Sequence, residues 1–143
     1  MTLPVEDRLA LHELLARYTH YLDYGRIDHM NEVWTDNCHF SADNPPVDIR
    51  GLDNLQAFFR STVTTLPHVR HVISNLWIEP GTDGDSSGDR SGKNTSDDSA
   101  ILHAYLQIVD FQSHALIAAG RYRDQVVRTP GGWRIQRREF TAG

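Results

Sequence analysis

Two residues in this sequence have the types that general acid–base chemistry needs. His71 lies near the start of an apolar run over residues 70–78, whose β-branched and aromatic side chains predict a strand. Asp23 lies in the expected last turn of the first helix, where the helix dipole disfavours a carboxylate. An unperturbed imidazole titrates near physiological pH, so His71 could accept a proton while Asp23 orients its ring. The pair predicts an acid–base site.

Simpler interpretations of both residues remain open. Asp23 could be a solvated residue before the turn at Gly25, and a single strand histidine is more often structural than catalytic. Side chains alternate along a strand, so the face that carries His71 should also carry Ile73, Asn75 and Trp77. Asn75 and Trp77 could line a pocket with His71 or could simply pack.

The elements that must position these residues follow from the hydrophobic pattern. Residues 4–24 predict a long amphipathic helix, with an apolar stripe that includes Tyr18 and with Gly25 as its stop. Shorter helices are expected at 28–34 and 52–64, the second with Phe58 on its buried side, and short strands at 38–42 and 47–50. Long strands follow at 99–112, 114–127 and 133–140. Helices first and strands later predict an α+β fold, with helices on one face of a curved antiparallel or mixed sheet.

Residues 79–98 are rich in Gly, Ser and Asp and offer no apolar anchor. We expect a mobile surface loop there, inside one domain that spans residues 1–143. The loop would separate two strands of the same sheet, so it does not predict a domain boundary.

Composition narrows the function. The chain has 143 residues, 39% hydrophobic and 23% charged, with a formal net charge of −5. That charge argues against nucleic acid as a partner. No signal peptide and no membrane-spanning run are expected, so we predict a cytoplasmic protein without a membrane partner. The eight histidines lack metal-ligand spacing and the one cysteine cannot form an internal disulfide, so we expect no metal site.

Four segments together resemble the SnoaL-like group of the nuclear-transport-factor-2-like superfamily. They are Tyr-Leu-Asp-Tyr-Gly-Arg-Ile-Asp at 21–28, His-Val-Ile-Ser-Asn at 71–75, Gly-Arg-Tyr-Arg-Asp at 120–124 and Gly-Trp-Arg-Ile at 132–135. The resemblance covers nearly the whole chain except 79–98. It implies a cone-shaped α+β barrel, in which a strongly bent sheet and the N-terminal helices enclose an apolar pocket.

The resemblance also implies roles for particular residues. In the dehydratase and dehydrochlorinase branch, an Asp at the end of the first helix pairs with a His on the strand after the third helix, and Asp23 and His71 match both places. Tyr18 matches a tyrosine of bile-acid dehydratases, and Arg138, with Arg137 close behind, matches an arginine in the last strand of a dehydrochlorinase. Catalytic residues are thus expected to be His71, Asp23, Tyr18 and Arg138. Substrate contacts are expected from Phe58, Asn75, Trp77, His103, Tyr105 and Tyr122.

Two departures from the family pattern argue against a scytalone-type mechanism. Scytalone dehydratase has a tyrosine where this chain has Leu22, and a second pocket histidine near the place of Gly120-Arg121-Tyr122. His103, on the preceding strand with Tyr105, could substitute, or it could be an ordinary exposed or hydrogen-bonded histidine.

The expected function is a cofactor-independent dehydratase, lyase or isomerase that acts on a small, mostly apolar, cyclic ligand. Two other classes stay open: a noncatalytic ligand-binding or assembly module, and the small subunit of a ring-hydroxylating dioxygenase. We expect a homodimer or homotrimer, with the convex side of the sheet as the interface, because strand 99–112 is apolar on both sides.

Overall fold

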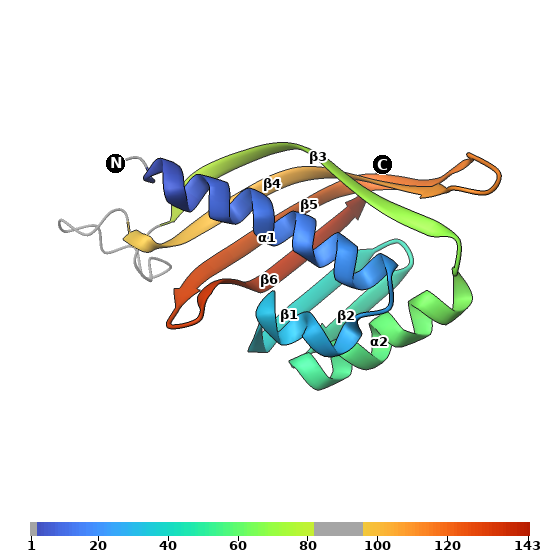
Figure 1. Ribbon diagram of the computed structural model, residues 1–143, viewed down its shortest axis with the longest axis horizontal. Coiled ribbons are helices and arrows are strands. Elements are labelled where there is room, and N and C mark those ends of the chain that lie inside the picture. The colour runs from blue at the N-terminus through green and yellow to red at the C-terminus, as the bar shows by residue number, and fades with distance from the viewer. Residues whose placement is uncertain (1–2, 82–95) are drawn as a thin grey trace.

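The computed structural model describes residues 3–81 and 96–143, which form helices and strands in the predicted order (Figure 1). The elements are α1 (Val5–Asp23), the 3₁₀ helix η1 (Ile27–Glu32), β1 (Trp34–Asp43), β2 (Pro46–Arg50), α2 (Leu52–Thr65), β3 (Val69–Gly81), β4 (Ser96–Asp110), β5 (Leu116–Thr129) and β6 (Gly132–Ala142).

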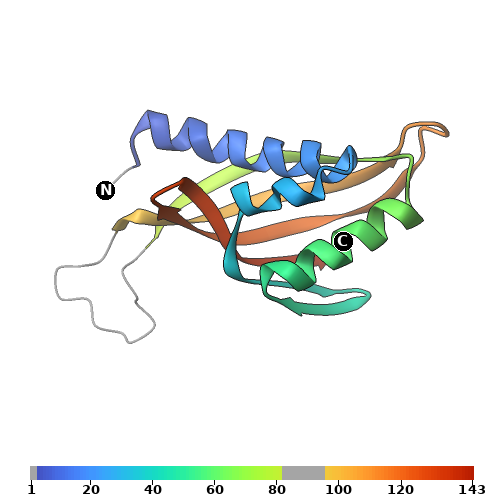
Figure 2. The same ribbon diagram turned by 60° about the horizontal axis from the view of Figure 1, so that its bottom comes forward.

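The six strands form one mixed sheet in the order β2-β1-β6-β5-β4-β3. Only β1 and β6 pair in parallel; the other neighbours are antiparallel. The helices lie on one side of this sheet (Figure 2). The α+β prediction is therefore confirmed. The sheet is curled but not closed, and β2 and β3 are its edges.

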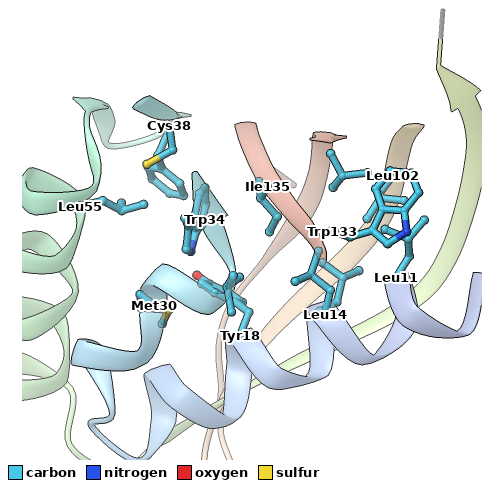
Figure 3. Packing of buried hydrophobic residues seen from close by; sticks show 14 of the residues in the cluster. Leu11, Leu14, Tyr18, Met30, Trp34, Cys38, Leu55, Leu102, Trp133 and Ile135 are labelled. Carbon is cyan, nitrogen blue, oxygen red and sulfur yellow. The ribbon is translucent and has the colours of Figure 1, made fainter. Parts of the chain in front are cut away.

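Helix α1 covers the inner face of the sheet because one side of it is apolar. Leu11, Leu14 and Tyr18 of this stripe face the sheet and pack with side chains such as Trp34 and Ile135 (Figure 3). The helix ends where expected, since Gly25 takes a φ of +74°, a left-handed conformation that favours glycine. This end places Asp23 in the last position of α1.

A bulge in β3 overturns the prediction that His71, Ile73, Asn75 and Trp77 share one face. The register between β3 and β4 shifts between Ser74 and Trp77, and Asn75 has a φ of +55°. One extra residue in the bulge moves every later side chain to the other face. His71 and Ile73 face inward, whereas Trp77 is 60% exposed on the outer face.

Several boundaries also differ from expectation; for example, the strand expected at 38–42 is β1, which begins at Trp34. The loop predicted at 79–98 begins later and ends earlier than expected, because β3 extends to Gly81 and β4 begins at Ser96. Residues 82–95 lie outside the described residues, so the mobility predicted for them stays a prediction. The predicted helix at 28–34 is the 3₁₀ helix η1, which ends before β1.

None of the helices in the described ranges has both the length and the apolar character needed to span a bilayer.

Candidate active site

The end of α1 and the start of β3 bring Asp23 and His71 into contact. Asp23 Oδ1 lies 2.7 Å from His71 Nδ1, and Asp23 Oδ2 accepts a hydrogen bond of 2.9 Å from the backbone N–H of His71. Both side chains are nearly buried, with 5% of Asp23 and 7% of His71 exposed. The two hydrogen bonds replace hydrogen bonds to water that the Asp23 carboxylate loses on burial.

The contact with Asp23 determines which ring nitrogen of His71 can accept a proton from a substrate. An ionised Asp23 only accepts hydrogen bonds, so the neutral imidazole carries its proton on Nδ1 and leaves Nε2 as an acceptor. Within residues 3–81 and 96–143, Nε2 has no hydrogen-bond partner. A ring with one nitrogen hydrogen-bonded to a carboxylate and the other nitrogen free to accept a proton has the geometry of an oriented general base.

Two hollows adjoin His71. The smaller has a volume of about 10 Å³, room for about one water molecule, and lies between the end of α1, the end of α2 and the start of β3. The larger is a groove of about 430 Å³ between α1 and the edge strand β3. Leu15, Ala16, Ile73 and Leu76 line its length together with polar residues. Space for a ligand beside His71 therefore lies at the edge of the sheet.

Arg138 and Tyr18, both predicted to be catalytic, belong to a separate cluster in the core. Arg138 is fully buried and forms two hydrogen bonds of 2.7 Å to Asp124, which is also fully buried. Its guanidinium carbon lies 4.5 Å from the ring centre of Tyr18 and 3.6 Å from that of Tyr122. No described hydrogen bond or ring contact joins this cluster to Asp23 or His71, so the structure does not bring the four residues together.

Burial changes the titration of this core cluster. Burial raises the pKa of Tyr18, although the nearby Arg138 charge works in the opposite direction. Burial likewise raises the pKa of Tyr122 well above its ordinary value, and neighbouring Tyr18 adds to the effect. For Arg138, burial alone would lower the pKa, but the charge and hydrogen bonds of Asp124 outweigh it. The cluster therefore contains one ion pair and two neutral phenols.

A consequence is that the protein should lose stability in alkali. The folded state holds its phenolic protons above pH 10, where unfolded tyrosines release theirs, so the free energy of unfolding should fall as the pH rises through about 10. Urea unfolding at pH 8 and at pH 11 measures this fall. The Tyr122→Phe variant should show a smaller fall than the wild type; an equal fall in both would exclude Tyr122 as a cause.

The predicted substrate contacts are divided between the two faces of the sheet. Trp77, His103 and Tyr105 lie on the outer face, where Trp77 stacks on His103 at 4.6 Å and His103 contacts Glu79 at 2.6 Å. They adjoin a shallow hollow of about 490 Å³. Asn75 borders both this hollow and the groove beside His71.

The other two predicted contacts lie on the inner side. Tyr122 is in the core cluster, and Phe58 is partly buried against Phe40 at 5.9 Å between ring centres. Neither adjoins the groove beside His71.

Sequence reasoning missed two residues of interest, Asp124 and His12. The alternation of β5 carried a signal for Asp124, since it shares the inward face with Tyr122 and Val126. His12 gave no comparable signal, because an exposed helical histidine is common; it borders the groove that also contains His71.

The described residues include no group of three or more His, Cys, Asp or Glu side chains placed to hold a metal ion. The single cysteine, Cys38, is buried in the core, and burial raises the pKa of its thiol to about 11. A thiol with that pKa is almost entirely protonated at neutral pH and is a poor nucleophile.

Comparisons with known proteins agree with this fold. The model of the SnoaL-like domain family matches residues 4–139. An uncharacterized protein of Mycobacterium tuberculosis is 25% identical over 144 aligned positions, which cover 96% of this chain and 86% of the relative.

Among solved structures, a Nostoc punctiforme protein of unknown function with a cystatin-like fold superposes with a TM-score of 0.80 at 21% identity, over 100% of this chain and 96% of the other. A Novosphingobium aromaticivorans protein whose name proposes an aromatic ring hydroxylase superposes with a TM-score of 0.75 at 26% identity, over 99% and 92% of the two chains. A second protein of that organism, whose name proposes a scytalone dehydratase, gives 0.73 at 19% identity over 97% and 85%.

Proposed function

The chain belongs to the SnoaL-like domain family, and from that premise we propose that it is a cofactor-independent acid–base enzyme of the dehydratase, lyase or isomerase type. The observation that carries the proposal is the buried contact of 2.7 Å between Asp23 and His71, with His71 Nε2 left free. Members of this fold include dehydratases, isomerases and ring-hydroxylase subunits, so the buried pair is what favours chemistry over a purely structural role.

In this proposal His71 Nε2 removes a proton from a carbon that an adjacent carbonyl or double bond acidifies. The C–H electron pair forms a new C=C bond, and the imidazolium that results is stabilised by the Asp23 carboxylate. In a dehydration, the C–O bond breaks and the hydroxyl leaves as water with the abstracted proton. In an isomerisation, the imidazolium returns the proton to a different carbon.

The substrate would lie in the groove between α1 and β3. Its lining mixes apolar and polar side chains, which suits a small ring compound that carries polar groups, and its volume of about 430 Å³ falls within the usual range of small-molecule sites. Tyr18 and Arg138 take no direct part in this proposal, because both are buried in the core cluster and Arg138 is already paired with Asp124.

Deuterium exchange tests the proposal without a known substrate. The protein would be incubated in D₂O with a panel of cyclic ketones and cyclic hydroxyketones, and deuterium at carbon would be measured by mass spectrometry. A general base at His71 should catalyse incorporation into at least one class, and His71→Ala should abolish it. Equal incorporation by both proteins would contradict the proposal.

The outer face of the sheet supports a separate proposal on assembly, which is compatible with an enzyme and with a noncatalytic module. Trp77, Tyr105 and Leu116 are 60%, 56% and 58% exposed on β3, β4 and β5, and large exposed apolar side chains on one face often mark a protein contact. We propose that this face joins copies of the chain into a homodimer or homotrimer.

The double variant Trp77→Arg/Leu116→Glu should then shift the protein from oligomer to monomer in sedimentation equilibrium. Because both side chains are exposed in the single chain, the change should leave the fold intact in far-UV circular dichroism. A wild-type protein that is monomeric at all concentrations would rule out this interface.

A further inference from the structure

Beyond the proposed proton transfer, the groove beside His71 has a second polar end. His71 lies at one end, while His12 of α1 and Asn75 of β3 also border the same groove of about 430 Å³. Apolar side chains, such as Leu15 and Ile73, line the space between the two ends.

The arrangement of α1 and β3 sets the distance between these ends. The two elements run in opposite directions, and Asp23 at the end of α1 meets His71 at the start of β3 (Figure 1). The 11 residues from His12 to Asp23 correspond to about 16 Å of helix. The four residues from His71 to Asn75 correspond to about 13 Å of strand. The far end is thus about the length of three linked rings away from the position of His71 on the strand.

Asn75 is held in an unusual conformation at this end. Its φ of +55° is in the left-handed region, which costs energy for a residue other than glycine although Asn tolerates it better than most. The bulge interrupts the alternation of the strand at Asn75, which is exposed and borders the groove. Bulges of this kind often redirect a side chain towards a binding site.

Both far-end side chains are available as hydrogen-bond donors. Neither His12 nor Asn75 has a side-chain hydrogen bond or ion pair to another described residue. An amide N–H and an imidazole N–H offer donors to an oxygen acceptor, and a protonated His12 would add a positive charge.

We propose that His12 and Asn75 form a recognition subsite for an oxygen acceptor at the far end of an elongated, flat, apolar ligand. This inference rests on the proposed function for the identity of the reacting end, and it assigns the substrate class: a molecule with the length of about three linked rings, with a carbonyl or carboxylate oxygen about 13 Å from the carbon that faces His71. His12 and Asn75 act as specificity-determining residues and take no part in proton transfer.

The test measures binding, so it does not depend on turnover. p-Terphenyl-4-carboxylate, which is long enough to extend from one end to the other, would be titrated into the full chain and followed by calorimetry and by the NMR signals of the His71 ring. Benzoate, with the same carboxylate on one ring, is the short control. The test variants are His12→Ala, which suits an exposed helical site, and Asn75→Gly, which removes the amide and tolerates a positive φ. Glu13→Gln, next to His12 on the exposed side of α1, is the matched control.

We expect p-terphenyl-4-carboxylate to shift the His71 signals of the wild type and benzoate to shift them much less. His12→Ala and Asn75→Gly should each weaken the longer ligand by about 3–10-fold, the loss typical of one hydrogen bond, and Glu13→Gln should leave it unchanged. The proposal would be overturned if both variants kept the wild-type affinity, or if the His71 signals did not shift at saturation. It would also be overturned if the wild type did not bind the longer ligand. Because binding is measured directly, tight binding by a wild type that catalyses no deuterium exchange would contradict the proposed function alone.

Discussion

The His71→Ala variant should lose about 10²–10⁴-fold of the rate at which the wild type removes a proton from carbon, the usual contribution of a positioned general base. His12 also borders the groove, but no described carboxylate is paired with its ring, whereas Asp23 orients the ring of His71. Ligand binding should survive, because the apolar lining of the groove is unchanged.

Asp23→Asn should lower the same rate through a different physical effect. An amide cannot stabilise the imidazolium by charge, and its NH₂ group can hydrogen-bond Nδ1 so that the proton moves to Nε2. The variant should therefore retain the shape of the site and lose its activity.

The chain contains a matched control for both variants. His103 contacts the carboxylate of Glu79 at 2.6 Å, but this pair is partly exposed on the outer face of the sheet. His103→Ala should keep the wild-type rate of deuterium incorporation. Full activity in His71→Ala, or loss of activity in His103→Ala alone, would show that His71 is not the base.

The second large effect is expected on stability. Arg138→Leu and Asp124→Leu should each lower the free energy of unfolding by about 3–5 kcal/mol, because each leaves an uncompensated charge in the core. Both side chains are fully buried, and their two hydrogen bonds of 2.7 Å are mutual. Urea unfolding monitored by tryptophan fluorescence gives the free energy.

The double variant Arg138→Leu/Asp124→Leu tests whether the stability losses of the single variants come from an unpaired buried charge. It should be markedly more stable than either single variant, because no buried charge remains. The exposed pair Arg123–Glu139, with a nitrogen–oxygen distance of 3.6 Å, is the control, and its removal should cost at most about 1 kcal/mol. Additive losses in the Arg138 and Asp124 variants would show that the pair is not the source of their effect.

Local patterns predicted most of the fold. The apolar stripe and Gly25 located α1 to within one residue at each end, and the strand-forming residues after Pro67 predicted β3. Local patterns placed Asp23 and His71 at the ends of their elements, but the pairing of the two residues was favoured by the family resemblance. Their catalytic roles stay predictions.

The bulge and the core ion pair were beyond the same reasoning. A bulge at Asn75 depends on the register that β3 takes against β4, a long-range property, so the alternation rule wrongly placed Trp77 beside His71. Arg138 was expected near the reacting atoms because the sequence does not reveal that it pairs inside the core with Asp124, 14 residues earlier on the neighbouring strand.

The most direct test of the central claim is the tautomer of the His71 ring, measured by ¹⁵N-resolved NMR of the imidazole in the free protein at a pH where the ring is neutral. The geometry predicts a proton on Nδ1, hydrogen-bonded to Asp23, and an unprotonated Nε2 that can accept a proton from a substrate. A proton on Nε2 would contradict the account, because that nitrogen could then not act as the base.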